Sequence, residues 1–235
     1  MPRKTLGIIG GMGPMATVLL MKLIVKMTMA SHDQEHIPIL LRHCPYIPDR
    51  TAFILDASKP DPLDYIVDEG KKLVEDGVCE IAIPCVTAHY FHAKLNEMLS
   101  VPVINGVEEV IDRAAMSGDR TVGIMATDGT IKARLFEAFA DKAGISYIYP
   151  EPSLQRKVME IIYGSTKAGR SADVGALYEI REALAADGAD EVILGCTELS
   201  VIADECGIQD DFLDVTFALA RRCVSDMGIL REEYR

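Results

Sequence analysis

An internal repeat is the feature of this sequence that most restricts its fold. The segment Thr5–Ile8 reads TLGI and recurs as TVGI at Thr121–Ile124, and Gly13 recurs as Gly129 at the same separation of 116 residues. Both segments are short apolar runs that lead into a glycine-containing turn and then into a helical pattern, as expected for a strand followed by a helix. The sequence therefore predicts two related units.

A second group of matches is separated by 111 residues. Asp76–Gly77 recurs as Asp187–Gly188, and Cys85 recurs as Cys196. The two separations differ by five residues, which indicates one small insertion or deletion between the units. Each cysteine ends an apolar, strand-like run, and ligands of open α/β sheets bind beyond the carboxyl ends of the strands. A pseudo-twofold arrangement of the units would place both cysteines at one cleft.

Strand-like and helical patterns alternate along the chain of 235 residues, which predicts parallel sheets with helices on both faces. The predicted fold class is α/β, with two pseudo-symmetric halves, each a mostly parallel sheet flanked by helices. The active site is expected in the cleft between them. We predict a first α/β domain from residues 1–105 plus 210–235 and a second from residues 106–209. The last helix, from Phe212, is expected to pack on the first helix.

Composition and charge exclude several classes of protein. Asp and Glu number 36 against 24 Lys and Arg, and the net charge of −12 disfavours binding to nucleic acid or anionic membranes. No apolar run approaches the roughly 18 residues of a membrane span, and the sequence begins without a secretory signal pattern. The six cysteines lack Cys-x-x-Cys spacing. We therefore expect reduced thiols and a cytoplasmic location.

Cys85 and Cys196 are candidate acid/base groups. Each precedes a helical pattern whose first turn holds a threonine, Thr87 or Thr197, and the amino end of a helix favours a thiolate. Two thiols on opposite sides of a cleft can remove a proton from one face of a substrate carbon and supply one to the other face. Stereoinversion requires that arrangement. A free cysteine is more often an inert buried residue, but the matched positions in the repeat favour a function for this pair.

Five segments occur in order along almost the whole chain: Leu6–Thr17, Ile47–Thr51, Pro84–His89, Gly123–Thr130 and Leu194–Leu199. Together they resemble the aspartate/glutamate racemase family, and most of all its aspartate racemase branch. The resemblance implies racemisation of a small anionic amino acid, aspartate before glutamate, without pyridoxal phosphate, another cofactor or a metal.

By the same resemblance, Cys196 deprotonates the L-enantiomer and Cys85 the D-enantiomer. An amino-acid α-proton is far less acidic than a thiol, so stabilisation must come from desolvation and from donors around the α-carboxylate. The candidate donors are backbone N–H groups and hydroxyls: Gly11, Met12, Gly13, Thr87, Thr127, Thr130 and Thr197. Glu198 is expected to orient Cys196 or the substrate amine, the alternative being a first-turn acid that complements the helix dipole.

Two cations are expected to bind the second carboxylate of the substrate. The resemblance assigns this role to Arg50, which offers a planar fork, and to Lys167, which offers a point charge. The alternative for each is a solvated surface cation. Val86 departs from the family pattern, because an asparagine that is thought to donate to the substrate commonly stands there. An unmet polar group would cost about 1–3 kcal/mol, so substrate identity depends on this position.

Two other motifs carry less weight. Gly11–Ala16 fits G-x-G-x-x-A, but Asp33 precedes the next strand instead of ending it, so a dinucleotide site is not expected. His89 and His92 form His-x-x-His, which is one weak hint of a metal site. We predict no metal.

The helical stretch Pro14–Ala30 is apolar on nearly all faces. Such a helix is either fully buried or half of a subunit interface, and we predict a homodimer. Three alternative functions stay open. They are a sister two-cysteine isomerase resembling maleate isomerase, a racemase of another amino acid, and a non-catalytic protein that binds a small ligand.

Overall fold

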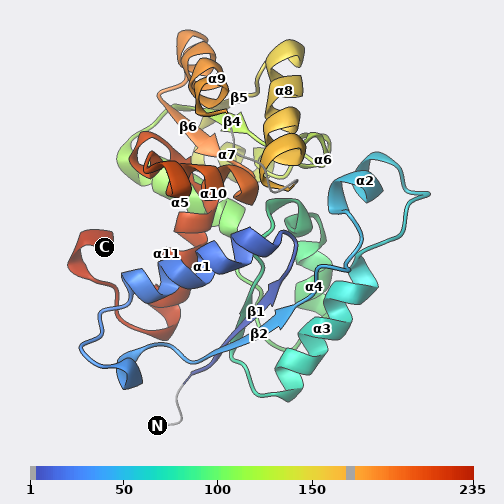
Figure 1. Cartoon of the computed structure of the whole chain (residues 1–235), viewed down its shortest axis with the longest axis vertical. Coiled ribbons are helices and arrows are strands. Elements are labelled where there is room, and N and C mark those ends of the chain that lie inside the picture. Colours follow the sequence, from blue (N-terminus) through green and yellow to red (C-terminus); the bar gives the residue numbers. More distant parts are fainter. Residues whose placement is uncertain (1–3, 168–172) are drawn as a thin grey trace.

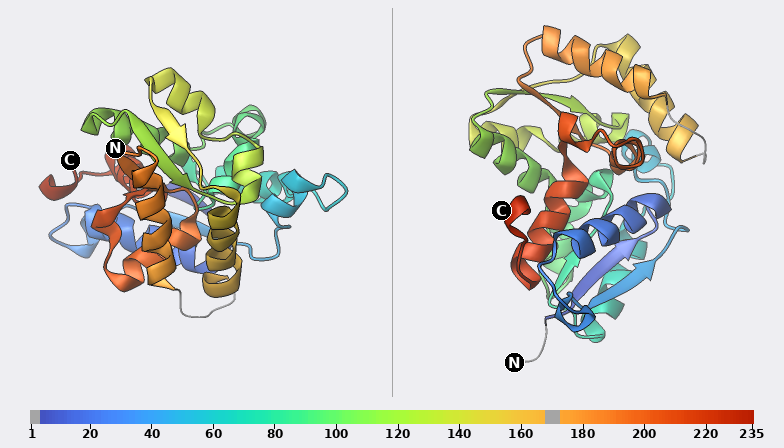
Figure 2. Two further views of the ribbon diagram at one scale, coloured as in Figure 1. Left: turned by 90° about the horizontal axis from the view of Figure 1, so that it is seen from above. Right: turned by 60° about the vertical axis from the view of Figure 1, so that its left-hand side comes forward.

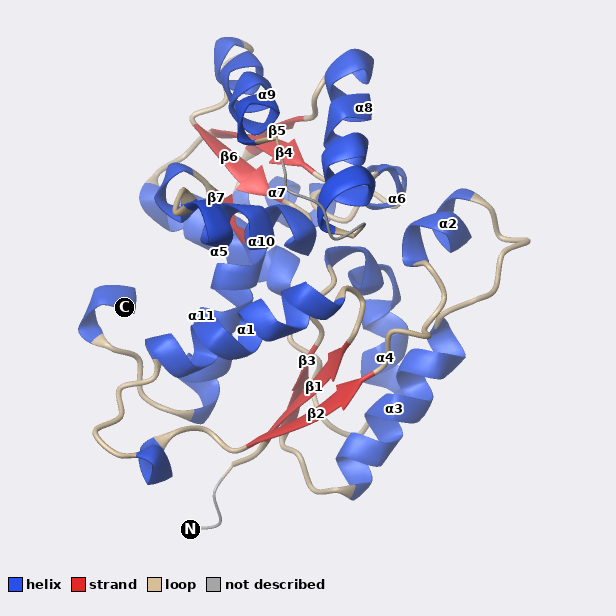
Figure 3. Ribbon diagram, viewed as in Figure 1, coloured by secondary structure: helices blue, strands red, loops and turns tan. Residues whose placement is uncertain are grey.

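The computed structural model describes residues 4–167 and 173–235 and contains two lobes, stacked along the long axis of the molecule (Figure 1). Each lobe is built on its own parallel sheet, and helices cover both faces of each sheet (Figure 3). The predicted fold class, two parallel sheets flanked by helices, is confirmed.

The first sheet has the strand order β2-β1-β3, with all neighbours parallel. In the register, Leu6 of β1 lies opposite Ile39 of β2 and Glu80 of β3. The elements of this lobe are β1 (Leu6–Gly10), α1 (Pro14–Met27), β2 (Ile39–His43), α2 (Arg50–Leu55), α3 (Leu63–Glu75), β3 (Glu80–Ala82), the 3-10 helix η2 (Val86–Phe91) and α4 (His92–Met98).

The second sheet has the strand order β5-β4-β6-β7 and is also parallel. Its strands are β4 (Thr121–Met125), β5 (Ser146–Ile148), β6 (Glu191–Leu194) and β7 (Leu213–Asp214). The helices that follow the first lobe are α5 (Gly106–Ser117), α6 (Asp128–Lys132), α7 (Glu137–Ala143), α8 (Pro152–Met159), the π-helical segment η3 (Glu160–Thr166), α9 (Val174–Ala186), α10 (Thr197–Cys206) and α11 (Val215–Met227). Short 3-10 turns occur at Asp33–Glu35, Gln209–Asp211 and Glu232–Tyr234.

The repeat in the sequence corresponds to a repeat in topology. The glycine-bearing strands β1 and β4 are each flanked by two parallel neighbours, and β3 and β6 hold equivalent places beside them. Cys85 follows β3 and Cys196 follows β6, and each residue is the N-cap of the helix that comes next. The two cysteines therefore occupy matching positions at the carboxyl ends of two sheets.

The division into domains stays a proposal, and the structure adds one detail to it. Strand β7, which the predicted boundary at residue 210 assigns to the first domain, pairs with β6 in the second sheet. The side chain of Asp214 accepts from the backbone N–H groups of Thr216 and Phe217, so β7 leads directly into α11. We propose that the chain leaves the second domain at this cap.

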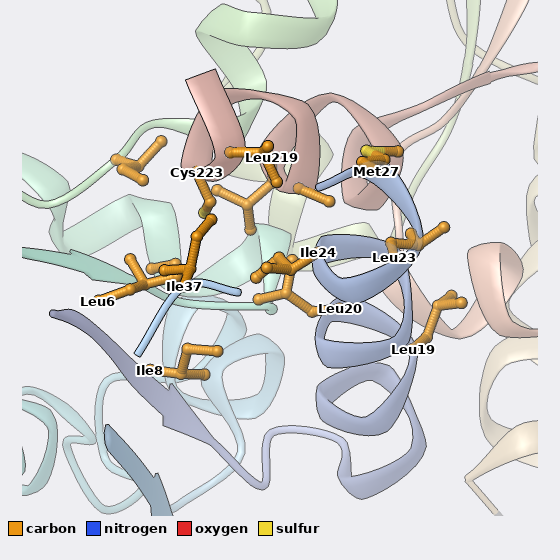
Figure 4. Packing of buried hydrophobic residues seen from close by; sticks show 14 of the residues in the cluster. Leu6, Ile8, Leu19, Leu20, Leu23, Ile24, Met27, Ile37, Leu219 and Cys223 are labelled. Atoms are coloured by element: carbon orange, nitrogen blue, oxygen red, sulfur yellow. The ribbon is translucent and has the colours of Figure 1, made fainter. Parts of the chain in front are cut away.

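Helices α1 and α11 pack together and against β1, as predicted for the last helix (Figure 4). Leu20, Ile24 and Met27 of α1 are fully buried against Leu219 and Cys223 of α11. Helix α11 also packs on α5, and it runs between the two lobes (Figure 2, right). The C-terminal helix α11 therefore packs against the first helix, α1, and also against α5. Through these contacts it holds the first lobe against the second.

Helix α1 is buried on one face only. Its other face exposes Met15, Val18 and Val25, each about half accessible, and Met29 is similarly exposed just after the helix ends. Within the described residues, no helix has the length and apolar character needed to cross a bilayer.

Candidate active site

Cys85 and Cys196 line one cavity between the lobes. Both residues are buried, with 6% and 5% of their surface exposed. The cavity is lined from the first lobe by Met12, Asp49, Arg50, Thr51, Cys85, Val86 and Thr87 and from the second by Thr127, Lys167, Cys196, Thr197 and Glu198. The two thiols that the sequence singles out are therefore brought to one enclosed space.

This catalytic cavity is nearly closed. Its volume is about 10 Å³, which is roughly the space that one water molecule requires. An amino acid needs many times that volume, so the structure corresponds to a closed state, and substrate entry requires the lining residues to move apart.

A carboxylate lies against the Cys196 thiol. The sulfur donates to Glu198 Oε2 at 2.9 Å, and the Thr197 hydroxyl donates to the same oxygen at 3.3 Å. Burial is the largest cause that raises the pKa of Cys196 well above its usual value, and the charge of Glu198 and its hydrogen bond raise the pKa further. Cys196 is consequently a protonated thiol in this state, with its proton directed at Glu198.

A cation lies against the Cys85 sulfur. The guanidinium of Arg50 lines the same cavity, and its interaction with Cys85 is the largest cause that raises the pKa of Arg50. Arg50 is 7% exposed, and burial alone would lower its pKa, but the charges of Cys85, Asp49 and Glu198 outweigh burial and raise the pKa. The two cysteines, although equivalent in topology, thus face partners of opposite charge.

Three backbone carbonyls hold Arg50 in place. Nη1 donates to Pro48 O at 2.9 Å and to Ile47 O at 3.3 Å, and Nη2 donates to Met12 O at 3.0 Å. Nε is buried and has no hydrogen-bond partner among the described residues. Arg50, predicted to bind the distal carboxylate, is therefore a buried group and not a solvated surface cation. Its Nε is a donor on a residue that lines the cavity.

Threonine hydroxyls join the two lobes beside the cysteines. The hydroxyl of Thr127, the N-cap residue of α6, lies 3.2 Å from that of Thr51 and 3.1 Å from that of Thr87. Thr130 lies 3.1 Å from Thr87 and 3.0 Å from Thr127. Thr130 belongs to this hydroxyl cluster but does not itself line the cavity. A substrate carboxylate could accept from these hydroxyls by replacing their mutual hydrogen bonds.

Asp49, Tyr163 and Lys167 form a contact across the mouth of the site. The Tyr163 hydroxyl donates to Asp49, at 3.2 Å from Oδ2, and the Lys167 ammonium lies 3.7 Å from the same oxygen. The ammonium also lies 4.0 Å from the centre of the Tyr163 ring. Burial lowers the pKa of Lys167, but Glu198, Tyr163, Cys196 and Asp49 together raise it. Lys167 therefore lines the site as a charged ammonium that is held by Asp49.

Sequence reasoning did not assign Asp49, Thr51 or Tyr163 to the site. Asp49 and Thr51 flank Arg50 in a segment already recognised, and a signal was available at Asp49, because an aspartate before a helical run is a typical N-cap. Its Oδ1 accepts from the Ala52 N–H at 2.9 Å. Tyr163 stands in a segment with no comparable motif, and its contact with Asp49 spans 114 residues.

The glycine turn acts mainly through its backbone. Gly11 has a positive φ of 93°, and its N–H donates to Thr17 Oγ1, so it does not offer that donor to the cavity. A Cβ at Gly13 would lie 3.0 Å from Glu198 Oε1, so glycine permits the carboxylate to approach. Of the predicted turn residues, Met12 is the one that lines the cavity.

Val86 lies between the cavity and an apolar core. It is 2% exposed and packs in a buried cluster that includes Val107, Phe136 and Val215. Val86, which stands in place of the asparagine, therefore packs against apolar neighbours and needs no hydrogen-bond partner. It also contributes to the cavity lining.

The two histidines near Cys85 are bound to the backbone. His89 Nε2 accepts from the Gly106 N–H at 3.0 Å, so Nδ1 carries the proton and faces the Cys85 and Val86 carbonyls. Burial lowers the pKa of His89 to about 4. Within residues 4–167 and 173–235, no group of three or more His, Cys, Asp or Glu side chains is placed to hold a metal ion.

Comparisons with known proteins agree with this geometry. Residues 9–223 match the family model described as Asp/Glu/Hydantoin racemase. The broad specificity amino-acid racemase RacX of Bacillus subtilis is 27% identical over 230 residues, which cover 94% of this chain and 96% of that one. The glutamate racemase of Deinococcus radiodurans is 30% identical over 74% of this chain and 63% of its own length.

Solved structures give the same result. The aspartate racemase of Picrophilus torridus superposes with a TM-score of 0.85 at 27% identity, covering 99% of this chain and 98% of the other. Glutamate racemase from Francisella tularensis has a TM-score of 0.65 at 19% identity, covering 95% of this chain and 80% of the other, which is a likeness of fold. Because the family match spans most of the sequence, the chain belongs to the Asp/Glu/Hydantoin racemase family, and amino-acid racemisation is the activity that this membership gives it.

Proposed function

We propose that this protein racemises an acidic amino acid, aspartate before glutamate, by a two-base mechanism in which Cys85 and Cys196 exchange protons with the α-carbon. No pyridoxal phosphate or metal takes part. The single observation that carries the proposal is the placement of both thiols in one closed cavity, with Arg50 beside one sulfur and Glu198 beside the other.

The chemistry consists of two proton transfers. One cysteine, as a thiolate, removes the α-proton and becomes a thiol, and the electron pair of the C–H bond passes to the α-carbon and its carboxylate. The other cysteine, as a thiol, donates its proton to the opposite face of the now planar carbon and becomes a thiolate. The substrate leaves with inverted configuration, and the two sulfurs have exchanged their protonation states.

Exclusion of water and nearby donors would lower the barrier. The closed cavity removes solvent, which strengthens every interaction with the charge that develops at the carboxylate. The neutral hydroxyl donors among the lining residues are those of Thr51, Thr87, Thr127 and Thr197. Preorganised donors of this kind are worth several kcal/mol of barrier, about 3–4 kcal/mol for one well-placed donor.

The charges of the site favour an amino-acid zwitterion that carries an additional carboxylate. Arg50 and Lys167 supply two cations, and Asp49 and Glu198 supply two anions. In the proposed complex the distal carboxylate of the substrate accepts from the free Nε of Arg50 and replaces Asp49 on Lys167. The ammonium of the substrate would lie toward Glu198.

A second candidate is racemisation of other amino acids. The relative RacX is described as a broad specificity amino-acid racemase, and Val86 offers no hydrogen bond at a position where the family commonly has an amide. A sister isomerase activity and a purely ligand-binding role remain outcomes that the same experiment distinguishes.

We further propose that the protein is a cytoplasmic homodimer. The proposed contact is the exposed stripe of α1, formed by Met15, Val18 and Val25. These residues recur at helical spacing, so they share one face.

The test is incubation of the purified protein with L-aspartate, L-glutamate, neutral amino acids and maleate, followed by chiral chromatography. The proposal predicts conversion of aspartate, slower conversion of glutamate, and loss of conversion in both Cys85→Ala and Cys196→Ala. Isomerisation of maleate without racemisation, or no reaction at all, would contradict it.

A further inference from the structure

A second and larger hollow lies beside the catalytic cavity. Its volume is about 1030 Å³, and it is lined by α6, by the chain after β5, by α8 and by η3. We name it the outer cavity. Its wall is largely apolar: Ile131, Tyr149, Pro150, Pro152 and Met159. Helices α6 and α8, which contribute to it, lie in the second lobe on the side that faces α2 (Figure 1).

Tyr163 belongs to both sites at once. Its ring lines the outer cavity, while its hydroxyl donates to Asp49, which lines the catalytic cavity. The Lys167 ammonium, which also lines the catalytic cavity, lies 4.0 Å from the ring centre. Tyr163 thus lines one space and is hydrogen-bonded to the lining of the other, and we call it the partition between them.

We infer that the outer cavity is a second subsite, which accepts the distal apolar part of large amino-acid side chains when Tyr163 is displaced, and that Tyr163 sets the length of side chain that the enzyme accepts. The inference rests on the proposed racemase function and concerns its substrate range. Tyr163 is here a specificity-determining residue and takes no part in proton transfer.

The chemistry of the outer cavity indicates the class of side chain. Five apolar or aromatic residues supply its wall, so a hydrocarbon or aromatic group gains from burial there. Its charged residues are already engaged or face solvent: Lys132 donates to Leu55 O at 2.9 Å, Asp128 accepts from Gln155, and Arg156 and Glu160 are exposed. A short acidic side chain reaches Lys167 without entering this space, whereas a phenylalanine or methionine side chain is long enough to meet the ring of Tyr163.

Displacement of Tyr163 has a cost in the unchanged protein. It breaks the hydrogen bond to Asp49 and the cation–π contact with Lys167. The loss of a contact of either kind costs a modest amount of free energy. Tyr163 therefore disfavours long substrate side chains without excluding them.

The experiment compares kcat/KM for aspartate, glutamate, methionine and phenylalanine in the unchanged protein, Tyr163→Ala, Tyr163→Phe and the control Tyr65→Ala. Tyr65 is an exposed residue of α3 that lines neither cavity. We expect Tyr163→Ala to raise the ratio of phenylalanine to aspartate by about 10- to 100-fold, the range by which a small volume change in an apolar pocket alters selection. Tyr163→Phe keeps the ring and the contact with Lys167 but loses the hydrogen bond to Asp49, so it should raise the ratio by less than Tyr163→Ala. Tyr65→Ala should leave the ratio unchanged.

A second variant, in which a larger side chain projects into the outer cavity, separates a change in substrate selection from a general loss of activity. In Tyr163→Ala combined with Ile131→Trp, the larger side chain takes up part of the outer cavity, and the gain for phenylalanine should be reduced while aspartate turnover stays at the level of Tyr163→Ala. An unchanged ratio in Tyr163→Ala, with aspartate still racemised, overturns this inference and leaves the proposed function intact. If the unchanged protein racemises none of the four amino acids, the proposed function fails, and this inference fails with it.

Discussion

The thiol of Cys196 donates a 2.9 Å hydrogen bond to Glu198, and this contact breaks the symmetry of the repeat. At the equivalent place in the first lobe, the sulfur of Cys85 meets the guanidinium of Arg50 instead. Burial and Glu198 raise the pKa of Cys196, so this thiol keeps its proton in the resting state. In the proposed mechanism a protonated Cys196 is the acid of the D-to-L direction, and the opposite direction first requires the proton to leave Cys196.

Removal of the Glu198 charge should favour the L-to-D direction at lower pH. Burial and Glu198 together raise the pKa of Cys196, so Glu198→Gln should lower that pKa by removing the second cause. The rise of kcat/KM with pH for L-aspartate should then begin at a lower pH than in the unchanged protein. Steady-state rates between pH 6 and 10 measure this shift. Glu198→Asp, which keeps the charge, is the matched control, and an unmoved pH profile in Glu198→Gln would refute the role given to Glu198.

Racemisation of aspartate should require both the positive charge of Arg50 and the planar geometry of its guanidinium. Arg50→Gln removes a buried cation that holds three carbonyls and contacts Cys85. A charged hydrogen bond is worth about 1.5–3 kcal/mol, which corresponds to a loss of roughly 10- to 150-fold in kcat/KM for aspartate. Arg50→Lys keeps the charge without the fork and should lose less. Equal rates for Arg50→Gln and the unchanged protein would remove Arg50 from the site.

A buried carboxyl outside the active site should make stability depend on pH. Burial, and then the charge of Asp226, raise the pKa of Glu80 to about 7 from its ordinary value of 4.5. The folded protein therefore keeps a proton that the unfolded chain has lost, and the free energy of unfolding falls as the pH rises from about 4.5 to 7. Glu80→Gln removes this penalty and should stabilise the protein at pH 8 by about 1–2 kcal/mol.

Urea unfolding at pH 5 and pH 8 tests that prediction. The gain from Glu80→Gln should be small at pH 5 and full at pH 8. A stabilisation that is equal at the two values would mean that Glu80 does not titrate in this range.

The proposed dimer predicts a charge-sensitive interface on α1. Val18 is 55% exposed at the centre of the apolar stripe, and Val18→Lys should separate the subunits at micromolar concentration in sedimentation experiments. Lys71→Ala on α3, outside the stripe, serves as the control. A sedimenting species of 25.7 kDa for the unchanged protein would contradict the dimer.

The sequence predicted those features that follow from local pattern and from the repeat. Short apolar runs and helical spacings located the strands and helices, and the matched glycines and cysteines indicated equivalent positions. The fold class and the placement of Cys85 and Cys196 at one cleft could therefore be predicted. The side chains that lie beside each sulfur could not be predicted in the same way. The role of Arg50 beside Cys85 depends on a turn that folds its guanidinium back onto the carbonyls of Met12 and Pro48, and no spacing in the sequence encodes that return.

Contacts between the lobes could not be predicted from the sequence for a different reason. Tyr163 and Asp49 are separated by 114 residues, and their meeting depends on how two independently folded sheets pack. Strand β7 could not be predicted from the sequence either, because two residues are too few to produce a periodic pattern. It pairs with β6 and ends at the Asp214 cap of α11.

The proposed two-base mechanism is tested most directly by the origin of the α-hydrogen in the first product. L-aspartate is incubated in D2O, and the reaction is stopped after a few per cent conversion. Mass spectrometry of the separated enantiomers should find one solvent deuterium in nearly all of the D-aspartate, while the recovered L-aspartate keeps its protium. D-aspartate that retains the original protium would mean that one group carries the proton across both faces, and the assignment of Cys85 and Cys196 as two separate bases would be wrong.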